Sequence, residues 1–154
     1  MISIPDKIHT ISIAFYKANT DYAEIDDKLI AWWTRGDYSH VELVINNNVM
    51  ISSSGRDGGV RIKKHTYNTD QWKYISIDIE PKYIKEFYEQ TKNDKYDFLG
   101  ILGFIFPIKD RTNKWFCSEW VSNVLKISGC KKLFTLEPSK ISPNELYYIL
   151  KEIK

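Results

Sequence analysis

The sequence predicts an α+β protein in which an antiparallel sheet packs against helices. Segments with the two-residue alternation of strands, rich in β-branched and aromatic residues, dominate the first half of the chain. Segments with the spacing of amphipathic helices dominate the second half. No internal repeat or linker separates the halves, and 154 residues suffice for one core. We therefore expect a single domain over residues 1–154.

The expected strands follow one another through short turns. Residues 11–16 alternate and are rich in β-forming residues. Residues 39–45 and 49–53 flank a run of three asparagines, which is a hairpin signal. Residues 60–63 follow a glycine-containing turn, and residues 72–79 alternate again, so that five strands are expected.

The expected helices have apolar residues at a spacing of three and four. They cover residues 23–33, residues 81–92 with Pro81 in the first turn, residues 117–128, and residues 139–153 with Pro143 near the start. Residues 98–108 are apolar or glycine, but this stretch is shorter than the about 20 residues that a membrane span needs. We interpret it as a buried helix or as the lining of an acyl-chain pocket.

Composition excludes several classes of function. The net charge is +2 and the lysines are scattered, which does not indicate a nucleic-acid surface. The first residues lack the pattern of a secretory signal, so we expect a cytoplasmic protein, or one released by lysis as in a phage. A helix after Cys117 would place Cys130 about 20 Å away, too far for a disulfide. With no CxxC or His/Cys cluster, we expect neither a metal nor a cofactor, and we make no prediction of oligomeric state.

Cys117 is the candidate nucleophile. It lies in the first turn of the helix expected at residues 117–128, on the apolar stripe of that helix. The unpaired N–H groups and the positive end of the dipole at a helix start favour the thiolate, which is the nucleophilic form. The alternative is a buried cysteine that acts as a small hydrophobic residue.

A cysteine nucleophile needs a base, which is normally a histidine oriented by a third polar group. His9 precedes the first strand and His65 lies in a lysine-rich loop, so we interpret both as solvated. His40 begins a strand of Val, Leu and Ile, and Glu42 shares its face. Burying this pair without partners would be costly. The alternative is a histidine at the solvent edge, with Glu42 paired to an arginine at position 56 or 61.

The order and spacing of four stretches resemble the circularly permuted papain-like cysteine hydrolases, the permuted branch of the NlpC superfamily, related to lecithin:retinol acyltransferase. The stretches are YSHVELV (38–44), GGVR (58–61), YDFLG (96–100) and FCSE (116–119). In this branch the histidine precedes the cysteine, as it does here. The resemblance covers residues 11–125 and implies a permuted papain-like fold, in which an antiparallel sheet or small barrel packs against helices.

The resemblance also implies roles for single residues. Cys117 resembles the nucleophile of the family and His40 resembles the base. Tyr96 matches the aromatic hydroxyl that supports the site, although it could equally be a tyrosine at the edge of the core. Tyr38 lies just before His40 and just after two tryptophans, at positions 32 and 33. We interpret this group as core packing or as an aromatic wall beside the site.

The third polar residue has two candidates. In the family it usually lies on the strand after the histidine strand, which corresponds to Ser52, with Ser53 less favoured. Relatives more often carry Glu or His there, and a serine would stabilise an imidazolium less than a carboxylate does. Glu42 could fill the role instead, or could make a structural pair with Arg61. The choice between Ser52 and Glu42 stays open at this point.

These observations predict a cysteine-dependent hydrolase, a peptidase or amidase, or an acyltransferase. The reaction would cleave an amide or ester bond of a peptide-like or lipid-like substrate without a metal. The alternative is a catalytically inactive binding or interaction protein on the same fold, which a serine in the third position would favour.

Overall fold

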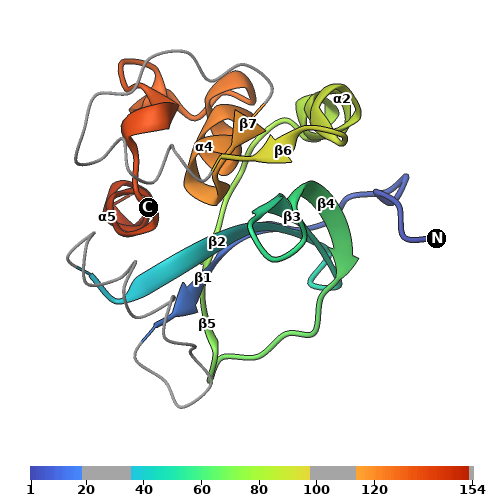
Figure 1. The fold of residues 1–154 in the computed structure, drawn as a ribbon, viewed down its shortest axis with the longest axis horizontal. Coiled ribbons are helices and arrows are strands. Elements are labelled where there is room, and N and C mark those ends of the chain that lie inside the picture. The colour runs from blue at the N-terminus through green and yellow to red at the C-terminus, as the bar shows by residue number, and fades with distance from the viewer. Residues whose placement is uncertain (19–35, 98–113, 153–154) are drawn as a thin grey trace.

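The computed structural model describes residues 1–18, 36–97 and 114–152, and this part of the chain has a mixed α+β fold (Figure 1). The strands are β1 (Ile11–Lys17), β2 (Tyr38–Ile45), β3 (Val49–Ser54), β4 (Gly59–Lys64), β5 (Trp72–Ser76), β6 (Lys95–Tyr96) and β7 (Lys114–Trp115). They form one seven-stranded sheet in the order β5-β1-β2-β3-β4-β6-β7. Neighbouring strands are antiparallel, apart from β6 and β7, which are parallel.

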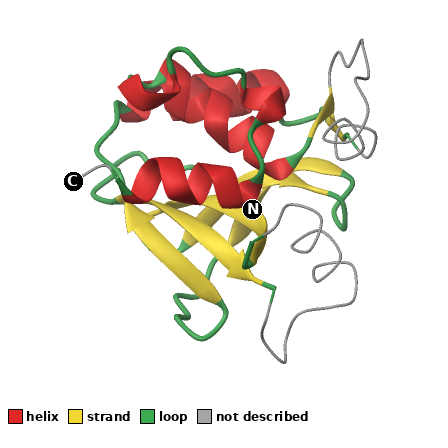
Figure 2. Ribbon diagram, turned by 90° about the vertical axis from the view of Figure 1, so that its left-hand side faces the viewer, coloured by secondary structure: helices red, strands yellow, loops and turns green. Residues whose placement is uncertain are grey.

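Helices lie along one side of the sheet (Figure 2). Those in the described residues are α2 (Pro81–Thr91), α4 (Cys117–Ile127) and α5 (Pro143–Lys151), with short 3₁₀ turns η1 (Lys131–Leu133) and η2 (Pro138–Lys140). None of the helices in these residues is long and apolar enough to cross a bilayer. The helix expected at residues 23–33 and the apolar stretch 98–108 fall outside the described residues.

The core lies between the sheet and α4 and α5. Ile13, Leu43 and Ile51 are adjacent in register on β1, β2 and β3, and all three are fully buried. They belong to one apolar cluster with the buried face of α4. Because alternate residues of a strand face opposite sides, β2 presents Leu43 to the helices and Glu42 to the other side of the sheet.

Three differences from the expected elements have local causes. β5 ends at Ser76 instead of Ile79, because its partner β1 begins at Ile11, whose carbonyl oxygen accepts the last ladder bond from Ile77 N–H at 2.9 Å. The last helix begins at Pro143 instead of Ser139. There Ser142 and Glu145 form a capping box, with hydrogen bonds of 3.1 and 2.9 Å. The two-residue strands β6 and β7 were not expected, because two residues carry no periodicity.

The turn between β3 and β4 packs against β6 and the residue just before it. Val60 N–H donates to the carbonyl oxygen of Asp94 at 3.0 Å, and Tyr96 N–H donates to the carbonyl oxygen of Gly58 at 3.1 Å. A Cβ at Gly59 would lie 2.1 Å from the Asp94 carbonyl oxygen, so only glycine allows this approach. Gly58 has φ +83° and open space around it, so its requirement is conformational.

This packing predicts very different costs for two apolar truncations on α4. Leu125 is fully buried, whereas Ile127 is 45% exposed. We expect Leu125→Ala to lower the free energy of unfolding by about 2–5 kcal/mol, because it leaves a cavity against the sheet. Ile127→Ala on the same helix should cost less than about 1 kcal/mol. Urea denaturation of both variants measures the difference, and equal costs would contradict the described packing of α4.

Candidate active site

The candidate site lies where β2 and β3 separate. Their pairing runs from Ile45–Val49 to Leu43–Ile51, although both strands continue further. His40 and Glu42 belong to the part of β2 that is paired only with β1. The chain leading into α4 meets β3 at this fork, because Ser53 Oγ donates to the Trp115 carbonyl oxygen at 2.6 Å. The start of α4 is thereby attached to the sheet beside His40.

Cys117 is the first residue of α4 and is 4% exposed. The residue before it, Phe116, is extended, and its N–H donates to the Glu119 carboxylate at 3.4 Å. The N–H groups of the first helical turn have no acceptor within the helix. They point out of the helix start, next to the sulfur, where a negative charge would be stabilised.

His40 lies between Cys117 and a carboxylate. Its Nε2 is 2.6 Å from Glu42 Oε1, and its side chain is 20% exposed. The Cys117 side chain is within hydrogen-bonding reach of the imidazole, and Nδ1 is the ring nitrogen that Glu42 leaves for it. Burial lowers the pKa of His40, but its interactions with Cys117 and Glu42 outweigh burial and raise this pKa to about 10. The surroundings of the ring therefore favour its charged form.

Glu42 is a buried, ionised carboxylate, and its side chain is 1% exposed. Arg61 on β4 holds both of its oxygens. Nη1 donates to Oε2 at 2.8 Å, and Nη2 forms an ion pair with Oε1. Burial raises the pKa of Glu42, but Arg61 and then His40 outweigh burial and lower it to about 2.

Ser52 is fully buried on β3, and continuing the β2–β3 register would put it opposite Glu42. Its hydroxyl donates to the Ser53 carbonyl oxygen at 3.4 Å, and its own carbonyl oxygen accepts from Arg61 Nη1 at 3.4 Å. Of the two candidates for the third polar residue, Glu42 is therefore the one whose side chain contacts the imidazole.

The two candidate tyrosines have different surroundings. Burial and the charges of Cys117 and Asp97 raise the pKa of Tyr96, so its hydroxyl stays protonated near the sulfur. Tyr38 packs against the rings of Phe15 and Tyr147, at centroid distances of 5.5 and 4.7 Å. Tyr38 thus belongs to the packing of α5 on the sheet, while residues 32 and 33 lie outside the described residues.

The expectation that His65 is solvated is wrong. His65 is 5% exposed, and its Nε2 lies 2.8 Å from the Tyr74 hydroxyl. Burial lowers the pKa of His65, which favours the neutral ring. The Trp72 ring neighbours both histidines, with ring-centroid distances of 5.7 Å to His65 and 6.4 Å to His40.

Sequence reasoning missed this aromatic cluster and the bidentate contact of Arg61. Trp72 pairs with Tyr16 across the β1–β5 ladder, and their rings are 5.0 Å apart. The alternation of residues 72–79 carried part of the signal, because it put Trp72 and Tyr74 on one face. Nothing in the loop sequence indicated that His65 would fold back onto that face.

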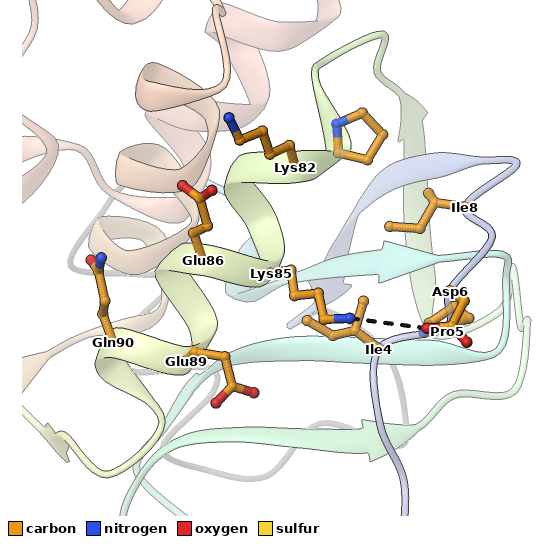
Figure 3. A pocket seen from close by; sticks show the side chains of 10 residues that line it. Ile4, Pro5, Asp6, Ile8, Lys82, Lys85, Glu86, Glu89 and Gln90 are labelled. Atoms are coloured by element: carbon orange, nitrogen blue, oxygen red, sulfur yellow. Dashed lines mark ion pairs between the residues drawn. The ribbon is translucent and has the colours of Figure 1, made fainter.

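A separate cavity of about 650 Å³ lies between the N-terminal segment and α2 (Figure 3). Charged side chains surround its opening, and Lys85 Nζ lies 4.0 Å from Asp6 Oδ1. None of the candidate site residues lines this cavity. Among the described residues, no group of three or more His, Cys, Asp or Glu side chains is arranged to hold a metal ion.

Comparison of the chain with protein-family models, with curated proteins and with solved structures found no match. The chemistry of the site therefore rests on its own geometry: a thiol at a helix start, an imidazole beside it, and a buried carboxylate behind the imidazole.

The Glu42 contacts predict a dependence of stability on pH. The folded pKa of about 2 lies below the value of about 4.3 expected in the unfolded chain. The stabilisation is therefore complete above about pH 4.3 and is lost as the pH falls through the folded value. We expect the advantage of the wild type over Glu42→Gln in unfolding free energy to shrink by roughly 3 kcal/mol between those limits. Urea titrations at several pH values measure it.

Glu86→Gln, which removes an exposed carboxyl on α2, is the matched control and should run parallel to the wild type. Parallel curves for the wild type and Glu42→Gln across this range would contradict the buried ionised state of Glu42.

Proposed function

We propose that this protein is a cysteine-dependent hydrolase or acyltransferase that acts on an amide or ester bond of a peptide-like or lipid-like substrate. The observation that carries the proposal is the arrangement of Cys117, His40 and Glu42. The base contacts the nucleophile on one side and a buried carboxylate, 2.6 Å away, on the other. Nucleophilic acyl transfer needs this combination of groups.

In the first half of the reaction the Cys117 thiolate attacks the carbonyl carbon and forms a C–S bond. The carbonyl oxygen becomes an oxyanion, which the N–H groups at the start of α4 stabilise, that of Cys117 among them. As the intermediate collapses, the imidazolium of His40 gives its proton to the leaving amine or alcohol. The C–N or C–O bond breaks, and the acyl group remains on sulfur.

In the second half water, or an acceptor hydroxyl or amine, attacks the acyl carbon while His40 takes its proton. The C–S bond then breaks, and the thiolate–imidazolium pair is restored. Glu42 keeps the imidazole in the orientation that serves both halves and stabilises its charged form. Tyr96, a protonated hydroxyl near the sulfur, is a further donor at the reacting centre.

We also propose that the fold is of the permuted papain-like type, in which the histidine strand precedes the cysteine helix along the chain. The support is the order of the elements, with β2 and its hairpin before α4. The cytoplasm suits the proposed chemistry, because reducing conditions keep a nucleophilic thiol from forming a disulfide. A binding protein without turnover is the second candidate, but the carboxylate behind His40 removes its main support, a serine in the third position.

The proposal predicts fast alkylation of Cys117 under mildly acidic conditions. Iodoacetamide should label Cys117 at about pH 6 at least about tenfold faster than an ordinary thiol, because the imidazole of His40 lies beside the sulfur and can act as its base. His40→Ala should remove this advantage, and Cys117→Ser should remove the label. Peptide mapping by mass spectrometry assigns the site.

Cys130 is the internal control, because burial raises the pKa of its thiol and should make its labelling slow. Probes with an acyl-type and a peptide-type electrophile, compared on the wild type and Cys117→Ser, then identify the substrate class. Equal labelling of Cys117 in the wild type and His40→Ala across the pH range would favour the binding protein.

A further inference from the structure

We propose that Arg61 is a positioning residue for the Cys117–His40 pair, because it holds both oxygens of the Glu42 carboxylate that contacts the imidazole. This inference rests on the proposed function and adds a residue two contacts away from the sulfur. Arg61 lies on β4, and its side chain reaches across the neighbouring strand β3 to Glu42 on β2.

The contact between Arg61 and Glu42 is bidentate. Nη1 and Nη2 each hold one carboxylate oxygen, and the oxygen bound by Nη2 is also the one that faces His40 Nε2. The planar guanidinium therefore fixes both the position and the rotation of the carboxylate. A lysine could supply the charge but not the second contact.

The guanidinium of Arg61 also contacts a carboxylate on the side that faces the solvent. Arg61 Nε donates to Asp57 Oδ2 at 2.8 Å, and Lys63 Nζ donates to Asp57 Oδ1 at 2.6 Å. Exposed fractions of the side chains rise along this series, from 1% for Glu42 to 16% for Arg61, 23% for Asp57 and 47% for Lys63. Charges alternate from the sulfur to the surface, so each buried charge has an opposite charge on both sides.

The titratable groups around Glu42 come from several elements. His40 lies on the same strand, Arg61 faces it from β4, and His65 feels its charge from the segment after β4. Cys117 of α4 contacts the far side of the imidazole. The nearest neighbours from β1 and β3, Ala14 by register and Ser52 by its continuation, carry no charge.

Removing Arg61 would leave Glu42 buried beside a single cation. Burial would then favour the protonated carboxyl, which no longer stabilises an imidazolium. As Glu42 took up a proton, His40 would lose its proton more easily, and the thiolate would lose its partner. The loss of reactivity should therefore begin at a higher pH than in the wild type.

The test follows the pH profile of Cys117 alkylation in Arg61→Met, Arg61→Lys and Asp57→Asn. We expect Arg61→Met to move the acidic midpoint upward by about one pH unit or more, and the other two variants to move it less. Lys64→Met, which removes an exposed charge from the same strand, should leave the profile unchanged.

Stability separates positioning from a purely structural role. The double variant Glu42→Gln/Arg61→Met removes both partners and should recover most of the stability that Arg61→Met loses. Its alkylation at acidic pH should stay low, because the carboxylate is absent. This variant also keeps the test usable if Arg61→Met alone does not fold.

A wild-type profile for Arg61→Met would overturn this inference while the proposed function stood, whereas a wild-type profile for the double variant would also remove Glu42 from the proposed mechanism. A wild type that shows no alkylation dependent on His40 would overturn the proposed function and this inference together.

Discussion

The burial of one carboxylate constrains the rest of the candidate site. Glu42 is almost completely shielded from water, and an isolated charge in such a position is expensive. Two cations compensate it, Arg61 from β4 and the His40 imidazolium from its own strand. Because both cations are held by the same carboxylate, the orientation of the imidazole depends on the pairing of β2, β3 and β4. The geometry around the sulfur is thus determined by the register of a sheet and not by a loop.

The two faces of strand β2 differ in polarity, and they contact different parts of the structure. Val41, Leu43 and Ile45 join the apolar cluster that includes α4, while His40 and Glu42 lie on the polar face. The two faces meet at the fork where β3 diverges, and there the start of α4 reaches the imidazole. Ser53 attaches the chain before α4 at this position through its hydrogen bond to the Trp115 carbonyl oxygen. Apolar packing therefore brings the thiol to the polar face without burying an unpaired charge.

The sequence allowed the hairpin and the starts of α2 and α4 to be predicted, but not which residue contacts His40. Positive φ values at Asn46 and Asn47 agree with the turn expected between β2 and β3, and the apolar stripe after Cys117 did predict α4. Alternation put Glu42 and Ser52 on the same face, since a period of two cannot distinguish residues on neighbouring strands. The longer side chain of Glu42 reaches both His40 and Arg61, and these contacts distinguish it from Ser52. His65 was misjudged because the composition of a loop does not reveal where that loop folds back.

The paired glycines of the β3–β4 turn have unequal tolerance to substitution. Gly58 needs a left-handed backbone but has open surroundings, so asparagine or aspartate, which enter that conformation most easily, are its natural replacements. Gly59 abuts the main-chain oxygen of Asp94, which cannot move aside like a flexible side chain. Among diverged copies of this chain, position 58 should therefore drift within a small group of residues, whereas position 59 should stay invariant. A close contact between two backbone segments restricts a sequence position more strictly than most side-chain contacts do.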